Sequence, residues 1–125
     1  GERVHTVTGD VRELLNHANQ IGEFDTLFHL AAIVSDWGAR QDHVETTVNG
    51  TKNAIALALQ NKAKFIVTTS IAAFASSLGS GHLDENFPIG KPSSHYEYVK
   101  QLQESVTLES VKNQGLNAVI IRPAN

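Results

Sequence analysis

The sequence predicts an α/β fold built on an open parallel sheet, because strand and helix patterns alternate along it. Along the 125 residues, short runs of β-branched and apolar residues alternate with longer segments of helical periodicity. The alternation of strand, helix and strand is typical of parallel βαβ units. Residues 76–94 are rich in Gly, Ser and Pro and predict a long loop, which in a compact domain usually has a function.

Four strands are expected. Residues 3–8 (RVHTVT) alternate valine with polar residues, and residues 26–34 form a near-continuous apolar run typical of a strand buried on both faces. Residues 64–70 (KFIVTTS) and 117–122 (NAVIIR) predict the other two. Ligands of parallel sheets bind at the carboxyl ends of the strands, so the residues after each run are candidates for a site.

The first and last helices have capping signals at both ends. Asp10, with a glutamate three residues later, resembles a capping box, and Gly22 predicts the end of that helix. Ser94 and Glu97 form a second capping box, which begins a helix that extends to Gly115.

The middle helix, expected at about residues 42–61, contains a local conflict. Apolar residues recur at helical spacing on both sides of Asn49-Gly50. Asn-Gly is nevertheless the strongest short hairpin signal, and Gly inside a helix costs about 1 kcal/mol relative to Ala. The apolar spacing favours one helix, and conflicts of this kind are often functional.

Composition excludes several classes of function. The apolar fraction of 41% and the charged fraction of 18% are those of an ordinary globular protein. A net charge of −3 gives no reason to expect nucleic acid or an anionic membrane as a partner, and no apolar run has the length of a membrane span. The absence of cysteine excludes disulfides and thiolate sites and is compatible with the cytoplasm. No two of the six histidines are four residues apart, so we expect no helical metal site.

Tyr96 and Lys100 are four residues apart on the last predicted helix and therefore share a face, whereas Tyr98 points away from Lys100. A tyrosine that acts as an acid or base near neutral pH needs its pKa of about 10 lowered by roughly three units. A lysine cation at about 4 Å supplies most of that shift, and a second positive charge completes it. By itself the pair is equally compatible with aromatic packing and a solvated cation.

Six motifs in register accompany this pair. They are GDV at 9–11, FHLAA at 28–32, VNGT at 48–51, FIVTTS at 65–70, YEYVK at 96–100 and IIRPAN at 120–125. In this order and spacing they resemble the extended branch of the short-chain dehydrogenase/reductase superfamily, the epimerase/dehydratase-like group. The resemblance covers essentially the whole chain. It implies a Rossmann-like parallel sheet with helices on both faces, and NAD or NADP as the cofactor.

The resemblance also implies roles for individual residues. Tyr96 would be the general acid/base and Lys100 its pKa-lowering partner and a ribose ligand. Ser70 would orient a substrate hydroxyl or carbonyl, and Asn49 would hold a helix kink and a proton-relay water. The implied cofactor contacts, besides Tyr96 and Lys100, are Asp10, Val11, Leu30, Ala31, Ala32 and Pro123.

Two departures from the family pattern stand out. The aromatic-glycine pair that often follows the serine strand is replaced by AFA at 73–75, with Phe74 in place of the usual tyrosine. The glycine-rich phosphate loop is also missing, because GSG at 79–81 does not lie between a strand and a helix. Since the chain also contains no methionine, we expect residues 1–125 to be the middle part of an NAD(P)-binding domain that lacks its first βαβ unit.

Three hypotheses for function follow. The first is an NAD(P)-dependent oxidoreductase or epimerase/dehydratase acting on a small hydroxyl or carbonyl substrate, with a homodimer of the full-length protein as a further expectation. The second is a non-catalytic NAD(P)-binding sensor or scaffold of the same fold. The third is a structural α/β domain in which Tyr96 only packs. Trp37, within VSDWG at 34–38, is a candidate for substrate contact or for shielding the core.

Without a glycine-rich loop to cradle the phosphates, the 125-residue chain is expected to bind NAD(H) or NADP(H) poorly. Titration calorimetry on the purified chain measures this directly. A submicromolar dissociation constant would contradict the expectation.

Overall fold

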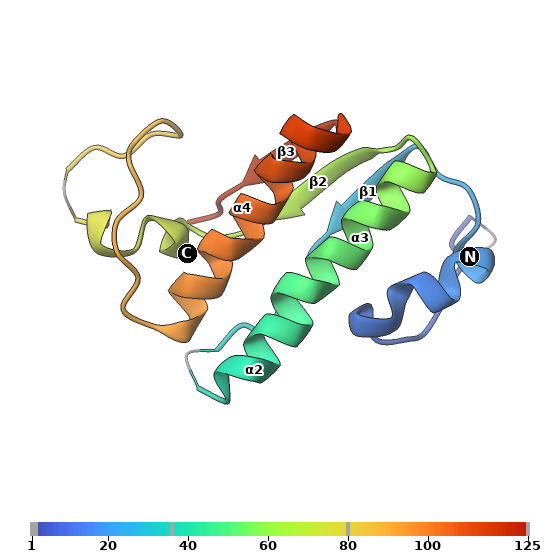
Figure 1. Ribbon diagram of the computed structural model, residues 1–125, viewed down its shortest axis with the longest axis horizontal. Helices are drawn as coiled ribbons and strands as arrows, with labels where there is room; N and C mark the ends of the chain where they lie inside the picture. The colour runs from blue at the N-terminus through green and yellow to red at the C-terminus, as the bar shows by residue number, and fades with distance from the viewer. Residues whose placement is uncertain (1–2, 36, 80, 125) are drawn as a thin grey trace.

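The structure is a computed structural model that describes residues 3–35, 37–79 and 81–124 (Figure 1). Its centre is a Rossmann-like, parallel three-stranded sheet with the strand order β1-β2-β3. The strands are β1 (Thr26–His29), β2 (Lys64–Thr68) and β3 (Ala118–Ile121). The fold class expected from the alternation of strands and helices is therefore confirmed.

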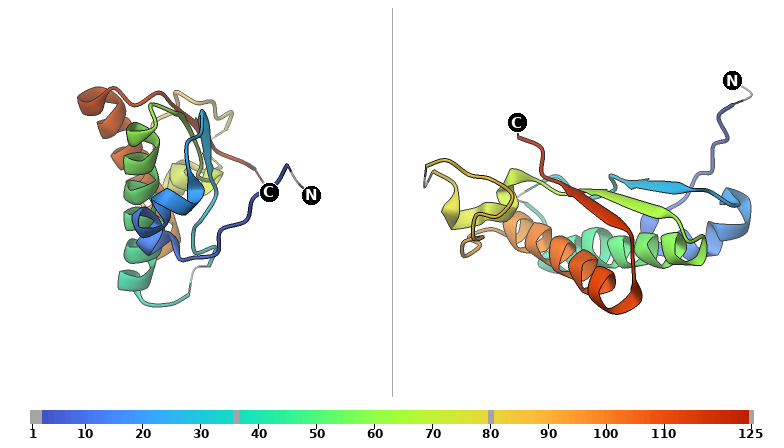
Figure 2. Two further views of the ribbon diagram at one scale, coloured as in Figure 1. Left: turned by 90° about the vertical axis from the view of Figure 1, so that its right-hand side faces the viewer. Right: turned by 90° about the horizontal axis from the view of Figure 1, so that it is seen from above.

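Two long helices, α3 (Asn49–Gln60) and α4 (His95–Gln114), lie side by side across one face of this sheet (Figures 1 and 2). The shorter helical elements are η1 (Val11–His17), α1 (Ala18–Ile21), α2 (Arg40–His43), η2 (Val44–Val48) and η3 (Ile71–Ser77). Within the described ranges, no helix combines the length and apolar character needed to cross a membrane.

The core forms where α3 meets the sheet. Small residues on the buried face of α3, Ala54 and Ala58, let the helix approach Phe65 and Val67 of β2 closely. All four side chains are completely buried. Burial of a side chain such as that of Phe65 contributes roughly 1.5–3 kcal/mol, so this contact fixes α3 on the sheet.

The expected strand at residues 3–8 is not formed, and this prediction was wrong. In the described part of the chain, β1 is an edge strand of the sheet, and residues 3–8 are not paired with it or with another strand. An extended segment needs such a partner for its backbone N–H and C=O groups. Alternation of valine with polar residues indicates a preference for strand, but it does not supply the partner.

The second predicted strand is shorter than expected and is buried on one face only. It ends at His29 rather than at residue 34, and Phe28 is 67% exposed. Phe28 is in register with Ile66, which is in register with Val119, on the face that faces away from α3 and α4. The expectation of helices on both faces is thus met on one face within the described residues.

The middle helix confirms the helical prediction across the Asn-Gly pair. α2, η2 and α3 follow one another without interruption from Arg40 to Gln60, and the wide π turn of η2 ends directly before Asn49. A Cβ atom at Gly50 would lie 2.8 Å from Cγ1 of Val11, closer than carbon atoms can approach. Gly50 is therefore needed for packing against η1, which explains the local conflict in the sequence.

The predicted N-caps at Asp10 and Ser94 are confirmed, although the Glu97 carboxylate accepts hydrogen bonds from Ser93 and not, as in a full capping box, from Ser94 N. Asp10 Oδ1 accepts a hydrogen bond from Arg12 N at 2.8 Å, and Ser94 Oγ accepts one from Glu97 N at 3.1 Å. Gly22 and Gly115 follow the two helix ends with positive φ angles of 78° and 69°. The first helix differs in its type, because η1 is a 3-10 segment with a break in helical geometry at Glu13.

The long loop predicted at 76–94 is fastened to the elements beside it. Gly90 N donates to the carbonyl of Phe74 at 2.8 Å, and the Gln101 side chain of α4 donates to the carbonyls of Ala73 and Gly90. η3 is kinked at Ala75, whose φ of 51° and ψ of −121° are unusual for a residue with a side chain. Such a backbone conformation costs on the order of 1–3 kcal/mol.

Ala75→Gly should therefore stabilise the protein by about 1 kcal/mol, since glycine adopts positive φ without steric cost while losing one buried methyl group. Ala73→Gly, in the same buried segment but without positive φ, is the matched control and should be destabilising. Chemical denaturation of both variants measures the difference. Equal destabilisation by both substitutions would show that Ala75 is not strained.

Candidate active site

Ser70 and Tyr96 line the same cavity, which has a volume of about 550 Å³. Ser70 follows β2 and caps η3, with its hydroxyl oxygen accepting a hydrogen bond from Ala72 N at 3.0 Å. Tyr96 is the second residue of α4. The cavity is also lined by the hydroxyl-bearing residues Ser35, Ser93 and Ser94. The structure thus brings together two of the predicted catalytic residues at the carboxyl end of β2.

Lys100 lies one helical turn after Tyr96 and is buried, with 2% of its surface exposed. Its Nζ atom is 5.5 Å from the centre of the Tyr96 ring. Burial lowers the pKa of Lys100 to about 8, while the Glu104 carboxylate acts in the opposite direction. The pairing expected from the i, i+4 spacing is therefore present. Lys100 approaches the Tyr96 ring from inside the protein and does not line the cavity that contains Ser70 and Tyr96.

Tyr98 has a different environment from Tyr96. The guanidinium of Arg40, from α2, lies over the Tyr98 ring at 4.2 Å from its centre. Tyr98 therefore packs between α2 and α4, as its place on the other side of the helix predicts.

Pro123 lies near Ser70. Its carbonyl accepts a hydrogen bond from Ile71 N at 3.2 Å, and the carbonyl of Ile121 accepts one from Thr69 N at 2.8 Å. These bonds extend the pairing of β2 and β3 beyond the strands themselves. They bring the segment after β3 to the start of η3.

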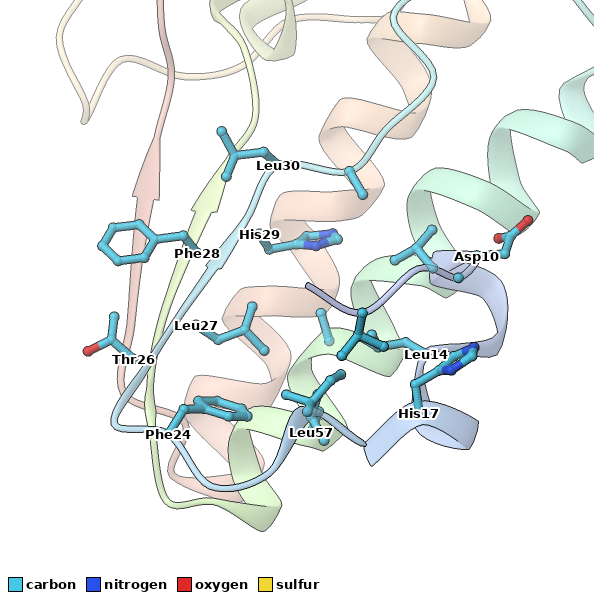
Figure 3. Close-up of a pocket in the computed structure, with 16 residues that line it drawn as sticks. Asp10, Leu14, His17, Phe24, Thr26, Leu27, Phe28, His29, Leu30 and Leu57 are labelled. Carbon is cyan, nitrogen blue, oxygen red and sulfur yellow. The ribbon is translucent and has the colours of Figure 1, made fainter. Parts of the chain in front are cut away.

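A second cavity, of about 600 Å³, lies between η1 and β1 (Figure 3). Four of the predicted cofactor contacts line it: Asp10, Val11, Leu30 and Ala31. Leu14 and His17 approach it from η1, and Leu27 and His29 point towards it from β1 (Figure 3). Most of this lining is apolar.

The segment after β1 connects the two cavities. Leu30 and Ala31 line the cavity beside η1, and a few residues later Val34 and Ser35 line the cavity that contains Ser70 and Tyr96. Between them, Ile33 N donates to the Thr47 hydroxyl at 3.1 Å, which fastens the segment to η2. One elongated ligand lying along this segment would contact both cavities.

Asp10 is the charged residue at the far end of this path. Its carboxylate accepts hydrogen bonds from Arg12 Nε at 3.0 Å and from Arg12 Nη2 at 2.6 Å. These bonds, together with that from Arg12 N, lower the pKa of Asp10 to about 2. Asp10 is therefore an anion at neutral pH and is held in place by its neighbour.

Three other predicted positions lie outside the two cavities. Asn49 is an exposed residue at the start of α3, and Ala32 is half-buried between the two cavity-lining parts of its segment. Trp37 is 84% exposed, and its carbonyl accepts a hydrogen bond from Nε2 of the buried His43 at 2.9 Å.

Of the motifs VSDWG and IIRPAN, Asp36 and Asn125 fall outside the described residues. Within the described ranges, no three His, Asp or Glu side chains gather as metal ligands would.

Sequence patterns did not reveal a buried polar cluster beneath the site. Gln103 of α4 and Thr51 of α3 are within 3 Å of each other, and Thr51 also bonds His29 at the end of β1. One signal was available, because Val99, Gln103 and Thr107 recur every four residues along one face of α4. A polar residue on a buried helical face needs a buried partner.

Burial, followed by the nearby charge of Lys100, lowers the pKa of His29 to about 4 from 6.5. Between these pH values the unfolded chain binds a proton that the folded chain does not. His29 therefore lowers the free energy of unfolding as the pH falls from 6.5 to 4, by roughly 3 kcal/mol in total at 1.4 kcal/mol per pKa unit.

His29→Gln should remove this acid sensitivity while keeping a donor for Thr51. Urea unfolding at pH 4 and pH 7 is expected to show a smaller stability loss for this variant than for the wild type. His82→Gln, at an exposed histidine, is the control and should behave like the wild type. The same stability loss in His29→Gln and wild type would contradict the prediction.

Known proteins resemble this chain in sequence and in fold. The NAD dependent epimerase/dehydratase family matches residues 1–125. A 3-beta-hydroxysteroid dehydrogenase from Mycolicibacterium neoaurum is 28% identical over 98% of the chain. The chain covers 36% of that protein's length.

Solved structures agree in fold. Pal from Bacillus thuringiensis superposes with a TM-score of 0.82 at 25% identity, covering 94% of this chain and 39% of that one. DesIV, a dTDP-glucose 4,6-dehydratase from Streptomyces venezuelae with NAD and TYD bound, superposes with a TM-score of 0.87 at 24% identity, covering 98% and 38%. The chain therefore spans little more than a third of the proteins it matches. Because the family match extends over all 125 residues, the chain belongs to the NAD dependent epimerase/dehydratase family.

Proposed function

We propose that the chain carries the catalytic residues of an NAD(P)-dependent oxidoreductase or epimerase/dehydratase, as part of its NAD(P)-binding domain. The observation that carries the proposal is the meeting of Ser70 and Tyr96 in one cavity, with the buried Lys100 one turn behind Tyr96. A packing role for Tyr96 would not account for a serine and a lysine at these two places.

The residues present fit much of a nicotinamide dinucleotide. The apolar cavity beside η1 suits an adenine ring, with Asp10 and Val11 at one side and Ala31 at the other. The segment after β1 leads from there to Ser70 and Tyr96, near Pro123, where a nicotinamide ring would lie. The sequence has no glycine-rich fingerprint, so it does not supply the residues that would bind the pyrophosphate.

Tyr96 is proposed to exchange a proton with the substrate, while a bound nicotinamide would supply or accept the hydride at its C4 atom. In the oxidising direction the phenolate oxygen of Tyr96 accepts the proton of the substrate hydroxyl; in the reducing direction the phenol donates it to the carbonyl. The Ser70 hydroxyl donates a hydrogen bond to the same substrate oxygen and so holds it beside Tyr96. The positive charge of Lys100 favours the phenolate.

The substrate is proposed to be a small molecule with a secondary hydroxyl or a carbonyl group. The relatives are named as a steroid dehydrogenase and a nucleotide-sugar dehydratase, which differ widely in the rest of the substrate. The hydroxyl groups of Ser35, Ser93 and Ser94 give this cavity several hydrogen-bonding partners for a polar substrate. Trp37, exposed on the segment after Ser35, is proposed as an apolar contact.

A homodimer is proposed for the whole protein. The surface proposed for the contact is the groove between α3 and α4, where the half-buried Leu59 and Val106 lie among polar residues. Sedimentation velocity distinguishes a dimer from a monomer.

Tyr96→Phe in the whole protein should lower turnover by orders of magnitude and leave cofactor affinity almost unchanged, because only the proton-transferring hydroxyl is removed. Tyr98→Phe is the matched control and should retain activity, since Tyr98 packs under Arg40. Nicotinamide absorbance with a panel of alcohols, ketones and nucleotide sugars measures turnover. Cofactor affinity is measured separately by calorimetry.

Near-normal turnover of Tyr96→Phe would contradict the assignment of the acid/base. A wild-type protein that binds the dinucleotide but turns over none of the panel would favour the non-catalytic sensor or scaffold.

A further inference from the structure

The ammonium of Lys100 is held by a neighbour that lies outside the predicted catalytic set. Lys100 Nζ donates a hydrogen bond to Gln103 Oε1 at 3.1 Å, and both side chains are almost completely buried. Among the described residues, this amide oxygen is the one hydrogen-bond acceptor found for Lys100. The nearby Glu104 does not take this role, because its carboxylate accepts hydrogen bonds from Arg122 and from Thr69.

The orientation of the Gln103 amide follows from the hydrogen bonds of Thr51. The single hydroxyl proton of Thr51 is donated to the carbonyl of Thr47 at 2.6 Å. The Thr51 oxygen therefore acts as an acceptor, for Gln103 Nε2 and for His29 Nε2, each at 2.9 Å. With its NH₂ group used in this way, Gln103 presents its oxygen to Lys100.

This arrangement also settles the tautomer of His29. The ring must carry its proton on Nε2 to donate to Thr51. Because burial keeps His29 neutral at physiological pH, it adds no second positive charge beside Lys100. The charge of Glu104, on the same helix, therefore acts on the ammonium, whereas the neutral His29 at the end of β1 contributes no charge.

We propose that Gln103 is a positioning residue for Lys100, held in place by Thr51 and His29, and that it keeps the buried ammonium charged and directed behind Tyr96. The inference rests on the proposed function for its catalytic meaning, whereas the hydrogen bonds themselves do not. An ammonium has three protons, so the bond to Gln103 leaves two N–H groups for Tyr96 and for a ribose hydroxyl. The chain of bonds joins the carboxyl end of β1 to the catalytic lysine.

The test uses the pKa of Lys100 in the whole protein, measured by NMR on ¹³C-labelled lysine, with Lys100→Arg identifying the signal. Gln103→Met keeps the shape but removes the acceptor, and should lower the pKa of Lys100 by about one unit, the value of one hydrogen bond to a charged group. Gln103→Glu places a carboxylate there and should raise it. Opposite shifts from two substitutions at one position separate positioning from a structural role.

Further variants keep the test informative if Gln103→Met fails to fold, which thermal unfolding detects. Thr51→Val removes the hydroxyl that orients Gln103 and should also lower the pKa of Lys100. Gln114→Met, the same substitution at the exposed end of α4, is the control and should leave this pKa unchanged. A Lys100 pKa that is the same in wild type, Gln103→Glu and Thr51→Val would overturn the proposal.

The kinetic consequence is measured in parallel. In Gln103→Met, kcat should fall at least tenfold near pH 7 and its pH profile should shift, while KM for the cofactor changes less. If no turnover occurs in the wild type but the Lys100 pKa moves in opposite directions, the proposed function fails and the positioning role stands. If the wild type turns over and Tyr96→Phe is inactive, but Gln103→Met changes neither the pKa nor kcat, the positioning role fails and the proposed function stands.

Discussion

The packing of α3 and α4 side by side on one face of the sheet determines where the candidate catalytic residues Ser70, Tyr96 and Lys100 lie. Ala54 and Ala58 bring α3 close to Phe65 and Val67, and α4 runs beside it. Because parallel strands end at the same edge, this packing places the start of α4 beside the residues that follow β2. Tyr96 and Ser70 meet there, although 25 residues of loop and helix lie between them in the sequence.

The same packing buries the ammonium of Lys100, which has an energetic cost. A seam between two helices and a sheet is a poor environment for an ammonium, and burial accordingly lowers the pKa of Lys100. An apolar residue would fill the space without that cost. The polar partners Gln103 and Thr51 reduce the penalty without providing a counter-charge, which leaves the positive charge of Lys100 able to act on Tyr96.

Much of this architecture follows from the sequence, because it depends on local signals. The caps at Asp10 and Ser94 and the helical spacing around Gly50 act within a few residues, so their structures were predictable. The six motifs also predicted Ser70, Tyr96 and Lys100 as site residues, and the first two of them line one cavity. The strand at 3–8 and the second covered face depend on partners distant in the sequence, and here local pattern was insufficient. The orientation of Gln103 depends on Thr51, 52 residues away, and was likewise out of reach.

We infer that one site extends from Asp10, along the segment after β1, to Ser70, Tyr96 and Pro123. A crystal structure of the whole protein grown with NAD or NADP measures this most directly. Our account predicts electron density for one dinucleotide along this path, with adenine beside Asp10 and Val11 and nicotinamide between Ser70 and Pro123. A dinucleotide bound elsewhere, or one whose nicotinamide lies far from Tyr96, would contradict the account.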